Sequence, residues 1–289
     1  MRGYLSNDHS KGLVLAVTGI LILTPDSLFI RLITADHWSL LFWRGLMTFT
    51  TLTLWQIYTC RKAALARFRV IGGLGLVVAL LFALNTTLFV ISIRHTAVAN
   101  TLVLLSAAPL FAAVFSSLFL REHAPLRTWI ATLIGIASIA LIMADSLGAA
   151  NLIGDGAALA MTITMAAILT LMRHMRSNNA VAIVALSGLL LALAMLIPAQ
   201  PFSLSGSDWL YMSLLGLVVI PVSFALALTA PRYLPAPEVG LIFLLETILG
   251  PFLVWLVLGE EPPVATLIGG VILIITLAGH AALSLRKIR

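Results

Sequence analysis

The sequence predicts an all-α polytopic membrane protein, and three observations support that prediction. Of its 289 residues, 61% are hydrophobic and 10% are charged, whereas soluble domains average roughly 45–50% and 25%. The apolar residues gather in ten stretches, each long enough to cross the hydrocarbon core as a helix. The connections between these stretches are short, so we expect no inserted soluble domain.

The ten predicted spans follow one another closely along the chain. Each contains roughly 19–23 residues, which at 1.5 Å per residue is about the thickness of the hydrocarbon core. The first stretch lacks a small-residue cleavage site, so we expect it to remain as the first span. The predicted spans are 12–33, 38–58, 70–92, 97–119, 127–145, 152–173, 180–198, 208–230, 236–257 and 264–284.

Lysine and arginine residues lie mostly on one side of the predicted membrane. With a cytoplasmic N-terminus, fourteen of them fall in cytoplasmic segments and only Arg31 and Arg94 fall on the opposite side, while Arg44 lies inside a span. This asymmetry follows the positive-inside rule, so both termini are predicted to be cytoplasmic. The net charge of +6 arises from these short loops, and we therefore expect no nucleic-acid partner.

The chain divides into two similar halves. Its most polar joint runs from Asp145 to Asp155 and separates two sets of five spans. A shift of 138 residues superimposes at least seven identical positions, among them Arg94 on Arg232, Glu122 on Glu260 and Pro125 on Pro263. We therefore predict two five-helix repeats, residues 1–148 and 149–289. Because five is odd, the second repeat should be inverted, an arrangement typical of secondary transporters with a substrate site at the repeat interface.

Short motifs in both halves resemble those of one transporter family. They are Phe42-Trp43-Arg44-Gly45-Leu46, Ser106-Ala107-Ala108-Pro109, Leu120-Arg121-Glu122, Leu245-Glu246 and Leu258-Gly259-Glu260. Over essentially the whole chain this pattern resembles the EamA-type transporters of the drug/metabolite transporter superfamily. The resemblance implies two EamA-like repeats, ten helices with cytoplasmic termini and a central cavity. It also implies export of amino acids, metabolites or toxic cations, and the chain looks most like bacterial exporters of aromatic amino acids.

The resemblance does not extend to the first helix of the small four-helix multidrug transporters. Those members carry a glutamate there, whereas this chain has Asp26. Their proton-coupling scheme therefore does not transfer, and the sequence leaves proton antiport and facilitated diffusion as alternatives.

Glu246 lies near the bilayer midplane, about ten residues from either end of the ninth span, where an ionisable group is costly. One interpretation is that it contacts a substrate ammonium group or takes up a proton during transport. The other is a protonated carboxyl that hydrogen-bonds a neighbouring helix, since burial favours the neutral form.

Asp26 and Arg44 are predicted at the same depth on consecutive spans, roughly 10–12 Å below one surface. Opposite charges so placed favour an ion pair that locks the first two helices together. The alternative is that Arg44 meets a substrate carboxylate in the outward-open state.

Further residues at membrane depth are candidates for the transport machinery. Prolines that interrupt four spans could act as hinges or as static kinks; they are Pro25, Pro109, Pro221 and Pro251. Polar and aromatic residues could line the cavity together with Glu246 and Arg44, or could serve helix packing; they are Asn85, Asn100, Ser106, Thr162, Phe82 and Phe243.

The sequence contains no HExxH, GxSxG or GxxxxGK[ST] motif and no His/Cys cluster with metal-ligand spacing. We therefore predict a protein that is not an enzyme and uses no cofactor or metal. The predicted function is secondary export, by alternating access, of small organic molecules across the bacterial inner membrane. Amino acids are the expected substrates, with aromatic ones preferred, together with related amphiphilic compounds.

Two alternatives to this function and one question about assembly remain. The first alternative is transport of nucleotide sugars or phosphorylated metabolites, but only Arg44 is an embedded cation. The second, from another class, is a membrane-embedded enzyme or a passive pore. The expected partners are the substrate and the lipid bilayer, and the oligomeric state is left open, with a monomer among the options.

Overall fold

The structure is a computed structural model that describes residues 2–60, 67, 68, 70–119, 126–146, 151–175, 180–227, 233 and 236–286. All regular elements within these ranges are helices, which confirms the predicted all-α fold. In chain order they are α1 (Arg2–Leu23), α2 (Asp26–Leu32), α3 (His37–Cys60), α5 (Gly72–His95), α6 (Val98–Ser106), α7 (Ala108–Phe119), α8 (Leu126–Ser146), α9 (Leu152–Met175), α10 (Ala180–Met195), α11 (Gly206–Ser213), η1 (Leu214–Val219), α12 (Ile220–Ala227), α13 (Ala236–Leu258) and α14 (Val264–Arg286).

Each of the ten predicted ranges coincides with one helix or one interrupted helix, with small shifts at the ends. Five helical segments within the described chain have the length and hydropathy needed to cross a membrane: Ser10–Leu32, Gly72–His95, Val98–Phe119, Leu152–Met175 and Gly206–Phe224. Four shorter apolar helices lie at Thr128–Ala144, Ala180–Met195, Ile242–Leu258 and Val264–His280. The predicted repeat boundary at 148/149 and the motif residue Glu122 lie outside the described residues.

Three of the predicted spans are interrupted, and a proline lies beside each interruption. The first breaks at Thr24–Pro25 between α1 and α2, where the Thr24 hydroxyl donates to the Ile20 carbonyl at 2.9 Å. Another breaks at Ala107 between α6 and α7, two residues before Pro109. The third contains the π-helical turn η1 just before Pro221. Proline lacks the backbone N–H that a continuous helix needs, but α13 runs unbroken through Pro251.

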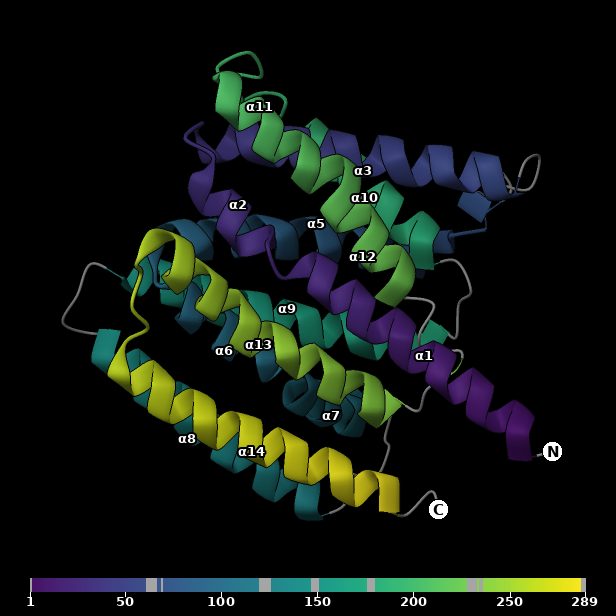
Figure 1. The fold of residues 1–289 in the computed structure, drawn as a ribbon, viewed down its shortest axis with the longest axis vertical. Helices are drawn as coiled ribbons and strands as arrows, with labels where there is room; N and C mark the ends of the chain where they lie inside the picture. The colour runs from purple at the N-terminus through teal and green to yellow at the C-terminus, as the bar shows by residue number, and fades with distance from the viewer. Residues whose placement is uncertain are drawn as a thin grey trace.

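The helices pack in a pattern that repeats between the two halves (Figure 1). The second helix of each half packs on its counterpart, α3 on α10, and the fifth helices, α8 and α14, do the same. The contact of α5 with α9 is matched by that of α12 with α1, and the contact of α7 with α9 by that of α13 with α1. Exchanging the halves therefore maps each of these contacts onto another of them.

Small residues allow the closest helix contacts. A Cβ added to Gly45 of α3 would lie 2.6 Å from the Gly188 carbonyl oxygen of α10, which is far inside van der Waals contact. Any larger side chain at this crossing would force the two helices apart. Small residues at helix interfaces serve this purpose in membrane proteins generally.

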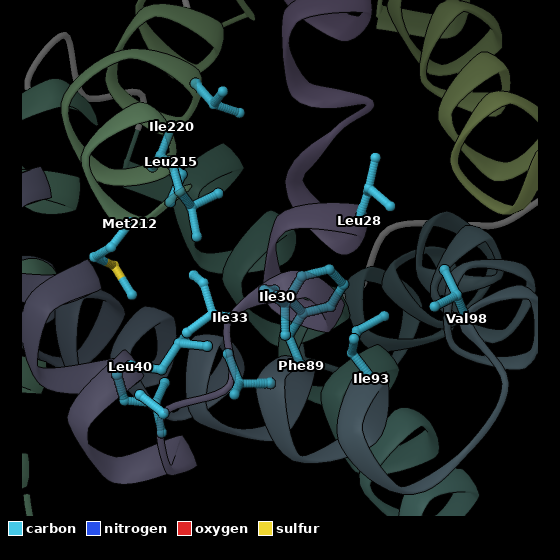
Figure 2. Close-up of a cluster of buried hydrophobic side chains, with 14 of the residues drawn as sticks. Leu28, Ile30, Ile33, Leu40, Phe89, Ile93, Val98, Met212, Leu215 and Ile220 are labelled. Carbon is cyan, nitrogen blue, oxygen red and sulfur yellow. The ribbon is translucent and has the colours of Figure 1, made fainter. Parts of the chain in front are cut away.

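The largest buried cluster surrounds the short helix α2 (Figure 2). Leu28 and Ile30 of α2 and Ile33 just after it lie among side chains of α3, α5, α11 and η1, including Phe89 and Met212. These apolar contacts fix α2 in the interior of the bundle. They also fix Asp26, the first residue of α2, because it belongs to the same short rigid element.

Both marked chain ends lie at one end of the bundle (Figure 1). At the other end, three connections come together: Ile33–Asp36 after α2, Thr96–Ala97 after α5, and Gly259–Pro263 after α13. Hydrogen bonds of Arg31, Arg94 and Val98 join these connections to one another. The candidate functional residues therefore lie in two places, inside the bundle and at this end of it.

Candidate functional site

Asp26 and Arg44 form a bidentate ion pair in the centre of the bundle. Arg44 Nη1 lies 2.5 Å from Asp26 Oδ1, and Nη2 lies 2.8 Å from Oδ2. Both residues are buried, and the guanidinium carbon of Arg44 lies 5.7 Å from the centre of the Phe89 ring. The two charges therefore satisfy each other, with both carboxylate oxygens occupied and an aromatic ring over the cation.

Glu246 adds a second carboxylate, and Asp26, Arg44 and Glu246 are together called the central group. Glu246 lies midway along α13, ten residues after Ala236 and twelve before Leu258, and within electrostatic range of Asp26 and Arg44. Because those two residues are buried inside the bundle, Glu246 faces inward. Its side chain is nevertheless partly exposed.

The carboxylate of Glu246 makes no hydrogen bond or ion pair to any residue that the structure describes. Asp26, in contrast, uses both of its oxygens on Arg44. A carboxyl group at this depth is costly unless it is paired or neutral. Glu246 is therefore the carboxylate of the central group that remains available to a ligand or a proton.

Helices α2, α6 and α13 meet next to Glu246, one turn further along α13. Gly250 lies directly against the Leu102 side chain of α6, and a Cβ built on Gly250 would be 3.7 Å from Ser27 Oγ of α2. The Ser27 hydroxyl is buried and has no hydrogen-bond partner in the structure. The contact between α2 and α13 thus contains one unpaired hydroxyl close to one unpaired carboxylate.

The other residues predicted to line a cavity lie in several environments. Asn85 is buried and donates to the Met161 carbonyl at 2.8 Å, which joins α5 to α9. Thr162 is fully buried and donates to the Ala158 carbonyl of its own helix at 2.8 Å. Ser106 is partly exposed and donates to Val103 at the end of α6. The structure does not bring these three residues to Glu246 through any hydrogen bond.

The two predicted aromatic residues are separate from each other. Phe82 of α5 is partly buried and packs on clusters that contain Ile183 and Val184 of α10. Phe243 lies three residues before Glu246 on α13 and is 38% exposed. Of this pair, only Phe243 is on the helix that carries the free carboxylate.

A second polar group closes the end of the bundle opposite the chain ends. We call it the polar mouth and define it as Arg31, Thr96, Asn100, Asp155, Glu260 and Thr266. Arg31 pairs with Glu260 at 3.0 Å and donates to the Thr96 carbonyl at 2.8 Å. Glu260 also accepts a hydrogen bond from the backbone N–H of Val98 at 2.8 Å.

Asp155 anchors the interior of the polar mouth. Its carboxylate is completely buried and accepts hydrogen bonds from the Thr96 hydroxyl at 2.5 Å and from the Asn100 amide at 3.2 Å. The Thr266 hydroxyl of α14 donates in turn to the Asn100 carbonyl oxygen. Gly154 allows this approach, since a Cβ there would lie 2.6 Å from the Thr96 nitrogen.

The loop from Ile33 to Asp36 is held beside the polar mouth. Arg94 donates to the Ile33 carbonyl at 2.7 Å and to the Ala35 carbonyl at 3.1 Å, while Asp208 accepts from the Thr34 N–H and hydroxyl at 2.8 and 2.9 Å. Partial burial opposes ionisation of Asp36, but hydrogen bonds from Ser39 and Trp38 outweigh it, so the pKa of the Asp36 carboxyl lies below its usual value. Asp36 therefore remains ionised and caps the start of α3.

Sequence reasoning missed the polar mouth. It treated Asp155 as the end of the joint between the halves and Glu260 as a marker of the repeat. One signal was available: Arg31 and Arg94 are the two arginines that depart from the positive-inside pattern. Charges in unfavoured positions are good candidates for specific intramolecular contacts.

Comparison with known proteins identifies the kind of protein to which this architecture belongs. The apolar helices and the buried charges define a multi-pass membrane protein. A family model described as the EamA-like transporter family matches residues 10–144 and 152–280. The chain therefore belongs to the EamA-like transporter family, whose members are membrane transporters rather than enzymes.

A search of solved structures and a search of curated proteins gave different results. A solved structure titled "Crystal structure of protein" matches with a TM-score of 0.66 and 18% sequence identity, covering 95% of this chain and 98% of the other. At this identity the match supports the shared fold alone. No curated protein matches the sequence.

Proposed function

We propose that the protein is a secondary transporter that exports small organic molecules by alternating access about the central group. The proposed substrates are amino acids, with aromatic ones preferred, and related amphiphilic compounds. The proposed location is the bacterial inner membrane, where ten spans would place both termini in the cytoplasm. The two repeats, residues 1–148 and 149–289, would then cross the membrane in opposite senses.

The observation that carries this proposal is the unpaired carboxylate of Glu246. An ionisable residue at membrane depth is usually functional, because its cost must be balanced by a role in binding or transport. Its inward position and partial exposure give a small molecule a point of attachment. A substrate ammonium group would supply the counter-charge that the described residues do not.

The polar mouth supports alternating access because its contacts join the two halves. Arg31, Thr96 and Asn100 come from the first half, and Asp155, Glu260 and Thr266 come from the second. In the proposed topology this mouth faces the outside, so the structure would correspond to a state closed toward the exterior. Export would then require the halves to separate at this mouth.

The helix interruptions give this motion suitable places to bend. Pro25 and Pro109 lie beside breaks in the first and fourth spans, and Pro221 follows the π-helical turn. Such irregular turns are common at functional sites. We propose that these three positions act as hinges, and that Pro251, inside the continuous helix α13, flexes less than they do.

Uptake of labelled tryptophan into proteoliposomes tests the proposed function. Wild-type protein should give saturable uptake and counterflow, which a passive pore does not show. Glu246→Gln keeps the shape of the side chain but removes its charge, and should lower the initial rate at least tenfold. Glu261→Gln is a matched control, because Glu261 is an exposed loop carboxylate of the same chain. Equal rates in wild type and Glu246→Gln would remove Glu246 from the mechanism.

A further inference from the structure

The central group contains two carboxylates and one guanidinium, and only one carboxylate lacks a partner. Asp26 and Arg44 neutralise each other through two hydrogen bonds. Glu246 lies within electrostatic range of both but pairs with neither. With all three groups ionised, the centre therefore carries one net negative charge, located at Glu246.

Arg44 is poorly placed to bind the carboxylate of a substrate. Its two terminal nitrogens are bonded to Asp26, its guanidinium group lies against Phe89, and only 7% of the residue is exposed. A substrate carboxylate would have to displace Asp26, which would then be buried without a counter-ion. Removing one partner of a buried ion pair is strongly unfavourable.

Arg31 and Arg94 are engaged away from the central group. Arg31 pairs with Glu260, and Arg94 is bonded to the carbonyls of Ile33 and Ala35, both at the far end of the bundle. The additional unpaired group near Glu246 is the hydroxyl of Ser27, which is neutral. Among the described residues around it, the centre thus has an unpaired carboxylate and an unpaired hydroxyl, and its one cation, Arg44, is already paired.

We infer that the site prefers amphiphilic amines that carry one positive charge and no free carboxylate. Arylethylamines and the amides or esters of aromatic amino acids have this chemistry. A zwitterionic amino acid brings the same ammonium group, but its carboxylate finds no counter-charge and lies close to Glu246 and Asp26. This inference rests on the proposed function and places the related amphiphilic compounds named there ahead of the amino acids as substrates of the same site.

Tryptamine and tryptophan form a matched pair of probes, because they share the indole ring and the ammonium group and differ by the carboxylate. Their binding is measured by equilibrium dialysis of the labelled compounds against the full-length protein in lipid nanodiscs. We expect tryptamine to bind at least tenfold more tightly than tryptophan. Glu246→Gln should reduce the affinity for tryptamine at least tenfold and remove most of the preference, whereas Glu261→Gln should change neither value.

Glu246→Asp provides a second variant in case the neutral substitution impairs folding. It keeps the charge, so the preference for tryptamine should persist. Equal or tighter binding of tryptophan, binding of neither probe, or an unchanged preference in Glu246→Gln would each overturn the inference. The proposed function is judged separately by transport: a protein that moves tryptophan in proteoliposomes but shows no preference in binding keeps the function and loses the inference.

Discussion

Replacing Glu260 with glutamine tests whether the polar mouth holds the two halves together. The substitution removes the negative charge that faces Arg31, yet keeps an oxygen that can accept the hydrogen bond from Val98. The ion pair joins α2 of the first half to the loop after α13 of the second. We expect its loss to favour the state in which this mouth is open.

The size of the effect follows from the exposure of the pair. A hydrogen bond to a charged group contributes about 1.5–3 kcal/mol. The two side chains keep 23% and 25% of their accessible surface, so solvent screening lowers this to about 1–2 kcal/mol. Because 1.4 kcal/mol corresponds to a factor of ten, the ratio of open to closed mouths should rise by roughly 5–30-fold.

A cysteine reporter measures that ratio. The chain has one cysteine, Cys60, which is first replaced by serine. Ser106→Cys then places a single thiol at the last residue of α6. A membrane-impermeant maleimide added from the side of the polar mouth should label this thiol roughly 5–30-fold faster in Glu260→Gln. Glu261→Gln, next to it in the chain, is the control.

The effects of substituting Arg31 and Glu260 should not be additive. If Arg31 and Glu260 act through each other, Arg31→Gln should accelerate labelling in the parent chain but add little in the Glu260→Gln background. An unchanged labelling rate in Glu260→Gln, or fully additive effects of the two substitutions, would refute the view that this ion pair keeps the mouth closed.

Two further predictions concern stability. Asp26→Asn should lower the free energy of unfolding in detergent by about 3–5 kcal/mol, because it leaves the buried guanidinium of Arg44 unpaired; adding Arg44→Gln should recover part of that loss, and a double variant no more stable than the single one would contradict this account. Gly45→Val should lower the apparent unfolding temperature, since its Cβ would meet the Gly188 carbonyl at 2.6 Å. Gly73 has open space around an added Cβ, so Gly73→Val is the matched control, and equal losses in both variants would show that the crossing of α3 and α10 is not limiting.

The fold could be predicted because its signals are local. A membrane helix needs about twenty apolar residues, and composition reveals that requirement directly. The pairing of Asp26 with Arg44 could also be predicted locally, because the two residues lie at equal depth on consecutive spans. The interruptions in the first and fourth spans also have a local cause, because each lies beside a proline.

The polar mouth could not be predicted in the same way because its residues meet only after the halves have packed. Asp155 is 55 residues from Asn100 along the chain, and Thr266 is 166 residues from it. Nothing in the neighbourhood of Asp155 indicates that a threonine and an asparagine will surround its carboxylate. The close approach of Gly154 to the backbone of Thr96 decides this contact, and that approach depends on the packing of α9 against α5.

Arg31 of the polar mouth and Arg94 beside it give a physical reason for the two departures from the positive-inside pattern. Arg31 and Arg94 each direct their guanidinium group at backbone carbonyls of neighbouring connections, and Arg31 also holds Glu260. Guanidinium carries several donors in one plane and can join such acceptors at once, which a lysine ammonium does less well. In the proposed topology Arg94 is kept outside because it holds the Ile33–Asp36 connection. Arg31 is kept there because it joins the two halves at the mouth, and this contact makes it a candidate for the outer gate.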